Sequence, residues 1–182
     1  MKALSNKAFF NGKTSDASKE FYTIYENAKF IVEILKNYLF RYNKERNKNL
    51  VIMCPWSKED SAFVKAFKEA GFKVINLTDS SKINEYEYDI IVDNPPFDTE
   101  QFKLVLSTKK PYFIYWSFLG AYYFLQKGWI TSREIIVAPT KFYNFLTPEG
   151  KKKHICACFL TNLVDYEEFV GMGWYDFNKL EE

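Results

Sequence analysis

The sequence predicts an α/β fold with a mostly parallel β-sheet flanked by helices. Short apolar runs recur along the chain, segments with helical spacing separate them, and polar turns lie at the junctions. Because a strand and its crossover helix return the chain parallel to the first strand, this alternation favours a parallel sheet. No internal repeat or linker divides the sequence. We therefore expect an N-terminal arm over 1–18 and a single domain over 19–182.

The first half of the chain predicts two helices and three strands. Apolar residues recur at helical spacing over 21–42, and the continuous apolar run over 50–54 is typical of a buried parallel strand. Ser57 or Asp60 is expected to cap the next helix, which Gly71 ends. Two further strands are expected over 72–77 and 88–92.

The second half continues the same alternation. Helices are expected over 99–106 and 118–127, the first capped by Asp98-Thr99, and strands over 112–116, 134–138 and 154–160. Cys156 and Cys158 alternate within the last of these runs, so both are expected to face one side of a strand as small core residues.

Composition excludes several classes of protein. Hydrophobic residues form 47% of the 182, which supports a folded core. The net charge of +2 is too balanced to indicate a nucleic-acid binder from composition alone. Three cysteines and one histidine show no disulfide or metal-ligand spacing. No stretch reaches the roughly 20 apolar residues of a membrane span, and we expect a cytoplasmic protein.

The segment Asp93-Asn94-Pro95-Pro96-Phe97 carries the clearest chemistry. It directly follows a buried-strand pattern, and ligands of doubly wound sheets bind at the carboxyl ends of strands. Two prolines stiffen the backbone and remove two amide donors, the Asn adds an amide oxygen, and the Phe adds a flat ring. Such a site suits a planar group that carries an amino function.

These residues resemble the Asn-Pro-Pro-Phe/Tyr signature of S-adenosylmethionine-dependent amino-methyltransferases. The chain looks closest to the small adenine-specific DNA enzymes of phage and restriction-modification systems, the EcoRI-type group. The resemblance implies a Rossmann-like methyltransferase fold and a flipped-out adenine whose amine is held by the Asn94 side chain and the Pro95 carbonyl. Phe97, after Pro96, would stack on the base while the amine attacks the cofactor's methyl group.

Other segments extend this resemblance over roughly 20–165. Phe21-Tyr22-Thr23 resembles a Phe-Tyr-Thr-Pro lead-in that contributes to the cofactor pocket, with Ile24 in place of the Pro. The segment 54–61 resembles a Cys-Pro-Phe/Trp…Glu-Asp-Ser variant, and 159–163 resembles a Trp-Phe-Thr-Asn-Leu segment. The family's glycine-rich cofactor loop is absent, because Pro55 and Trp56 occupy that place.

The resemblance also suggests cofactor contacts. Cys54 and Pro55 would contribute backbone, Trp56 an apolar wall, and Asp79 an acceptor for the ribose hydroxyls. Core packing for Trp56 and a cap before Ser80-Ser81 for Asp79 are the alternatives. Asp93 is a further candidate at the cofactor, with turn capping as its alternative.

Basic residues could bind the phosphates of DNA. The candidates are Lys141 and the run Lys151, Lys152 and Lys153, for which a solvated hairpin is the alternative. The leading hypothesis is an adenine-specific DNA methyltransferase. A non-catalytic relative with a degenerate cofactor loop, or a methyltransferase for RNA or protein glutamine, remains open. Target selection would come from loops, dimerisation or a partner subunit, because 182 residues leave little room for a recognition domain.

Overall fold

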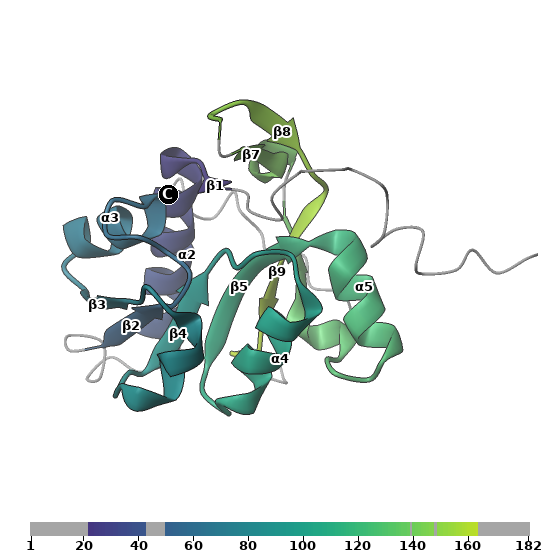
Figure 1. The fold of residues 1–182 in the computed structure, drawn as a ribbon, viewed down its shortest axis with the longest axis horizontal. Coiled ribbons are helices and arrows are strands. Elements are labelled where there is room, and N and C mark those ends of the chain that lie inside the picture. Colours follow the sequence, from purple (N-terminus) through teal and green to yellow (C-terminus); the bar gives the residue numbers. More distant parts are fainter. Residues whose placement is uncertain (1–21, 43–49, 139, 148, 164–182) are drawn as a thin grey trace, which may run out of the picture.

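Two sheets and four α-helices form the described part of the chain. A computed structural model describes residues 22–42, 50–138, 140–147 and 149–163 (Figure 1). The larger sheet has six strands and the smaller has three. Within these residues, no helix is long and apolar enough to cross a membrane.

The six-stranded sheet has the order β3-β2-β4-β5-β9-β6. Strands β3, β2, β4 and β5 are parallel, and β9 runs antiparallel between β5 and β6. This confirms the predicted mostly parallel sheet. Its strands are β2 (Val51–Cys54), β3 (Lys73–Asn76), β4 (Ile90–Asp93), β5 (Tyr112–Ser117), β6 (Ile135–Val137) and β9 (Ala157–Thr161).

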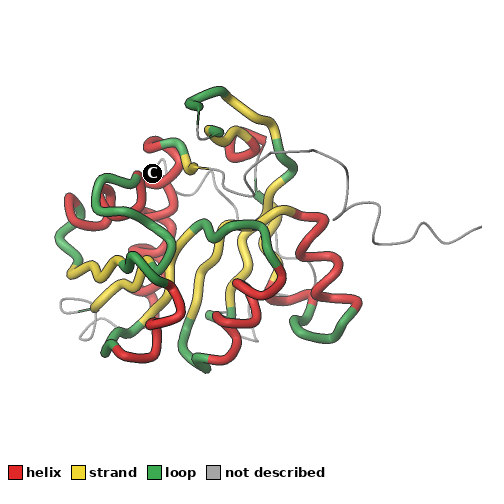
Figure 2. Tube along the Cα trace, viewed as in Figure 1, coloured by secondary structure: helices red, strands yellow, loops and turns green. Residues whose placement is uncertain are grey.

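Helices cover both faces of this sheet (Figures 1 and 2). Strand β5 shows why, because alternate side chains point to opposite faces. Phe113 and Tyr115 join one buried cluster, and Ile114 and Trp116 join the other. The first cluster packs under α2 (Tyr25–Tyr42) and α3 (Ala62–Glu69), and the second under α4 (Thr99–Ser107) and α5 (Phe118–Gln126).

The helix ends follow local chemistry. Asp98 accepts a hydrogen bond from the Glu100 N–H and begins α4, as predicted. Gly71, at φ +86°, follows the end of α3 in the left-handed region that glycine favours. The predicted cap of α3 was wrong, because Ser61 rather than Ser57 or Asp60 accepts the Val64 N–H. Short 3-10 helices span Ser80–Glu85, Ser132–Glu134 and Thr140–Tyr143.

A small antiparallel sheet of order β1-β7-β8 stands beside the carboxyl ends of the large one. Its strands are β1 (Tyr22–Thr23), β7 (Asn144–Leu146) and β8 (Lys152–His154). The expected helix over 21–42 was therefore wrong at its start. Tyr22 and Thr23 pair with Leu146 and Phe145, and such a distant pairing leaves no trace in local periodicity.

The expected strand over 154–160 was also wrong, because the chain forms two strands in different sheets. β8 ends at His154, β9 begins at Ala157, and the Cys156 carbonyl accepts the Phe118 N–H between them. Cys158 is buried as predicted. Cys156 is exposed, which corrects its assignment to the core.

Candidate active site

The candidate site lies at the point of the large sheet where successive strands are added on opposite sides of β2. After β2 the chain forms β3 on one side, then crosses to form β4 on the other side of β2. In open α/β sheets such a switch point leaves a crevice at the carboxyl ends of the diverging strands. Here Cys54 ends β2 and Asp93 ends β4, so the crevice lies between the two segments that the sequence singled out.

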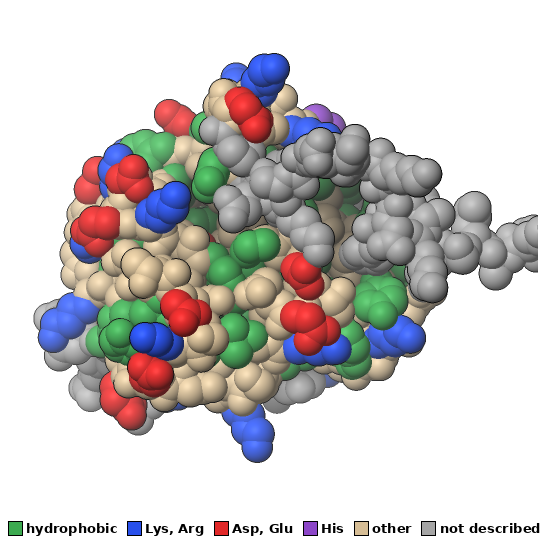
Figure 3. Space-filling view, viewed as in Figure 1, with side chains coloured by type: hydrophobic (Ala, Val, Ile, Leu, Met, Phe, Trp, Pro, Cys, Tyr) green, Lys and Arg blue, Asp and Glu red, His purple; other side chains and the backbone are tan. Residues whose placement is uncertain are grey.

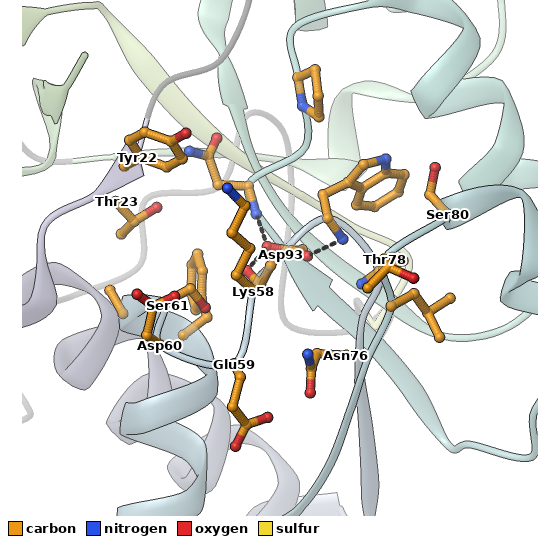
Figure 4. A pocket seen from close by; sticks show the side chains of 18 residues that line it. Tyr22, Thr23, Lys58, Glu59, Asp60, Ser61, Asn76, Thr78, Ser80 and Asp93 are labelled. Atoms are coloured by element: carbon orange, nitrogen blue, oxygen red, sulfur yellow. Dashed lines mark hydrogen bonds between the residues drawn. The ribbon is translucent and has the colours of Figure 1, made fainter. Parts of the chain in front are cut away.

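A cavity of about 770 Å³ opens at this point (Figure 4). Its size falls within the range of about 300–1,000 Å³ that is typical of small-molecule and cofactor sites. In Figure 4, Tyr22 and Thr23 border one side, Thr78 and Ser80 the opposite side, and Asp93 lies between them. The described residues that line it come from β1, the β2–α3 connection, the end of β3 and the β4 turn: Tyr22, Thr23, Pro55–Phe63, Asn76–Thr78, Ser80, Asp93, Asn94 and Pro96.

Asp93 holds the two turns of this crevice together. Its Oδ2 accepts the Trp56 N–H at 2.7 Å. Its Oδ1 accepts the Ser57 hydroxyl at 2.6 Å and the Asn94 N–H at 2.8 Å. The Asp93 side chain is 1% exposed, so these bonds form away from bulk water. They fix the β2 turn relative to the β4 turn, which favours the turn-capping interpretation of Asp93.

Burial changes the acidity of this carboxyl group. Desolvation raises the pKa of Asp93 from 3.8 to about 6, although the hydrogen bonds from Ser57, Trp56 and Asn94 act in the opposite direction. Near neutral pH the group is ionised and can accept from all three donors. Protonation would convert one acceptor site into a donor and weaken the link between the turns.

Trp56 forms an oriented wall of the cavity. Its indole Nε1–H donates to Gln101 Oε1 of α4 at 2.7 Å, and the side chain is half-buried. Ser80 Oγ donates to the same oxygen at 3.3 Å. Gln101 does not line the cavity itself, but it orients two residues that do. No local motif surrounds Gln101, and the sequence offered no signal for its role.

Thr23 borders the cavity and carries a buried polar atom. The residue is 9% exposed, and within the described residues its Oγ1 has no hydrogen-bond partner. Because an unsatisfied buried hydroxyl costs free energy, a polar ligand atom at this wall would be favoured. Tyr22 lines the same wall and is 42% exposed. Phe21, the third residue of the predicted lead-in, lies outside the described residues.

The Asn-Pro-Pro-Phe segment meets the cavity in part. Asn94 and Pro96 line it, and Pro95 is buried. Phe97 is half-buried, and its ring packs against Trp116 and Phe145 at centroid distances of 5.4 and 5.9 Å. Asn94 and Pro96 thus border the cavity, while the Asn94 Oδ1 atom is buried and the Phe97 ring faces the core. The predicted stacking by Phe97 stays a prediction.

Some of the other predicted cofactor residues line the cavity and some do not. Pro55 lines the cavity, while Cys54 is fully buried and desolvation raises the pKa of its thiol. Asp79 caps the helix Ser80–Glu85, where its carboxylate accepts the Ser81 N–H and hydroxyl. These bonds lower the Asp79 pKa. Asn76, the last residue of β3, lines the cavity where Asp79 was expected.

The predicted phosphate-binding lysines lie on the β7–β8 hairpin. Lys151, Lys152 and Lys153 are all exposed, which matches the solvated hairpin considered from the sequence. Lys141 belongs to the 3-10 helix Thr140–Tyr143, and its side chain lies outside the described part of the structure. The hairpin is joined to the cavity wall, because β7 pairs with β1.

Comparisons with protein-family models, curated proteins and solved structures found no match to this chain. The site must therefore be interpreted from its own geometry. That geometry offers an oriented indole, hydroxyl and amide side chains, a buried carboxylate and a stiff proline turn around one cavity. Among the described residues there is no cluster of three or more potential metal ligands.

Proposed function

We propose that this protein is an S-adenosylmethionine-dependent methyltransferase that modifies the exocyclic amine of adenine in DNA. The observation that carries the proposal is the position of Asn94 and Pro96 in a cavity of about 770 Å³ at the sheet's switch point. The methyltransferase variant of the Rossmann-like fold and a cytoplasmic location belong to the same proposal.

The residues of the cavity fit a cofactor that is apolar in part and polar at several points. Trp56 and Pro55 offer apolar walls, and the Thr23 hydroxyl is a buried polar atom that a ligand could satisfy. Asn76 and Thr78 can hydrogen-bond ribose hydroxyls. When bound, S-adenosylmethionine supplies an electrophilic methyl group.

The chain's own groups would hold and orient the substrate amine. The Asn94 side-chain oxygen and the Pro95 carbonyl would accept its hydrogen bonds, and the two prolines keep the turn stiff. Asp93 would hold the turn after β2 in a fixed position relative to the turn after β4, so it acts as a positioning residue. The loop from Trp56 to Ser61 would exclude water from one side of the cavity.

The test combines binding and transfer. Isothermal titration with S-adenosylmethionine should show affinity at or below the millimolar range, and radiolabel transfer should favour adenine-containing DNA over RNA and protein. Asn94→Ala should abolish transfer and leave the thermal unfolding transition nearly unchanged, because Asn94 borders the cavity and the residue is only half-buried. Absence of cofactor affinity at millimolar ligand would refute the proposal.

A second candidate is a non-catalytic relative that binds DNA. Two observations favour it: the Phe97 ring packs against Trp116 and Phe145, and the turn after β2 contains no glycine. DNA binding without cofactor binding would select this candidate. Transfer by the wild-type chain would exclude it.

A further inference from the structure

The small sheet places aligned rows of side chains beside the cavity. Tyr22 of β1 lies opposite Leu146 of β7, and Leu146 lies opposite Lys152 of β8. Residues directly opposite each other in antiparallel strands project from the same face. Tyr22, Leu146 and Lys152 therefore form one row across the sheet, which we call the Tyr22 row. The neighbouring row, Thr23, Phe145 and Lys153, projects from the other face.

The Tyr22 row carries an aromatic ring at one end and positive charge at the other. Tyr22 lines the cavity and is 42% exposed. Lys152 is exposed and is flanked by Lys151 and Lys153, with Glu149 as the carboxylate of the same hairpin. Figure 3 shows blue side chains at the top of the molecule, where Figure 1 places this hairpin, together with a purple and a red side chain.

The dimensions of the row suit one strand of nucleic acid. Two strand spacings separate Tyr22 from Lys152, which is about 10 Å. A DNA strand carries one phosphate per about 3.4 Å of axis, so about three phosphates would cross this face. Aromatic rings stack on bases of any sequence, and lysines neutralise the backbone beside them.

We propose that the Tyr22 row binds DNA, with Tyr22 stacking on a base at the mouth of the cavity and the hairpin lysines neutralising the adjacent phosphates. This inference deepens the proposed function, because it identifies which surface of the same site receives the substrate strand. It assigns to Tyr22 the base contact that the sequence resemblance assigned to Phe97, whose ring packs against the core.

The hairpin anchors the row firmly. Phe145 is fully buried, with its ring 4.7 Å from Tyr115 and 5.9 Å from Phe97 by centroid distance. β7 is therefore fixed to the main sheet, and β1 is fixed to β7. A competing explanation is that lysines on an edge strand such as β8 serve only to prevent pairing with other sheets. That explanation predicts no role for Tyr22 and no contribution to DNA binding.

The experiment measures binding of the full chain to fluorescein-labelled duplex and single-stranded DNA by anisotropy, over a series of salt concentrations. Tyr22→Ala should weaken binding by about fivefold to a hundredfold, because stacking on one base carries that range. Tyr22→Phe should retain affinity. Tyr86→Ala is the matched control, because Tyr86 is also 42% exposed, and it should bind as wild type does.

A second set of measurements tests the role of the hairpin lysines with two triple variants. Replacing Lys151, Lys152 and Lys153 with Gln should reduce the slope of log affinity against log salt by about one for each lysine that contacts a phosphate, and so by at least about one for Lys152 of the Tyr22 row. The control replaces three exposed lysines outside the hairpin, Lys73 in β3, Lys109 after α4 and Lys127 after α5, and should keep the wild-type slope. Circular dichroism and thermal unfolding of every variant check that the fold is retained.

The outcomes separate this inference from the proposed function. An unchanged affinity in Tyr22→Ala, equal losses in the two triple variants, or the absence of DNA binding by wild type would overturn the inference. If the row variants lose DNA binding but the wild type shows no cofactor affinity, the inference stands and methyl transfer fails. If the wild type transfers methyl groups while the row variants bind DNA normally, the proposed function stands and the inference fails.

Discussion

Replacing Asp93 with Asn tests the origin of the site's rigidity. The carboxylate is 1% exposed and its pKa is raised from 3.8 to about 6. Since one pKa unit corresponds to about 1.36 kcal/mol, the ionised group carries a cost of about 3 kcal/mol relative to the unfolded chain. Asp93→Asn removes this titration while keeping the shape of the side chain.

The direction in which the free energy of unfolding changes with pH depends on whether the folded or the unfolded state binds the proton of Asp93 more tightly. Between about pH 4 and pH 6 the folded protein keeps Asp93 protonated, whereas the unfolded chain has released that proton. The folded state then binds more protons, so the free energy of unfolding contributed by this group falls as pH rises. The contribution is fully present below about pH 4 and is lost by the time the pH passes about 6.

The assay is urea unfolding of wild type and Asp93→Asn at several pH values from 4 to 8. The variant loses hydrogen-bond acceptors at every pH, which sets a constant offset. Relative to the variant, the wild type should lose about 2.4 kcal/mol of the total as pH rises from 4 to 7, because the other titrating groups cancel in the difference. A difference in unfolding free energy that does not change with pH would refute the raised pKa and the burial argument behind it.

Three further predictions address packing, exposure and ligand recognition. Gly120→Ala should destabilise the protein by about 1–3 kcal/mol in urea unfolding, because the added Cβ would lie 2.2 Å from Trp116 Nε1; a change below about 0.5 kcal/mol contradicts this. Native protein should show one fast-reacting thiol with Ellman's reagent, lost in Cys156→Ser, since the other two cysteines are buried; a second fast thiol contradicts it. Asn76→Ala should weaken S-adenosylmethionine binding more than Asp79→Ala does in isothermal titration, and the reverse order would favour Asp79 as the ribose contact.

Much of the fold could be predicted because its signals are local. Continuous apolar runs marked β2 and β4, since parallel strands covered on both faces need apolar side chains throughout. Asp98 and Gly71 marked helix ends through contacts within a few residues. The same locality predicted that Asn94 lies at the carboxyl end of a strand, directly after Asp93 of β4.

The parts that could not be predicted depend on distant partners. Tyr22 and Thr23 form a strand because Phe145 and Leu146 pair with them, and the helical periodicity that follows masked the boundary. Cys156 lies in an apolar run that resembles one strand, yet the chain changes sheets there. Asp79 was preferred because of its charge, although the side chain facing the cavity belongs to Asn76.

Asp93 offers a physical explanation for the absence of a glycine-rich turn after β2. A glycine-rich turn lets backbone approach a ligand, but it leaves the turn flexible. In this chain the β2 turn contains Pro55 and Trp56, and a carboxylate from the neighbouring strand fixes it through the Trp56 N–H and the Ser57 hydroxyl. Rigidity here comes from a buried charge that is half protonated near pH 6. The shape of the cavity and the ionisation of Asp93 are therefore coupled, so ligand affinity should weaken as this carboxylate is protonated.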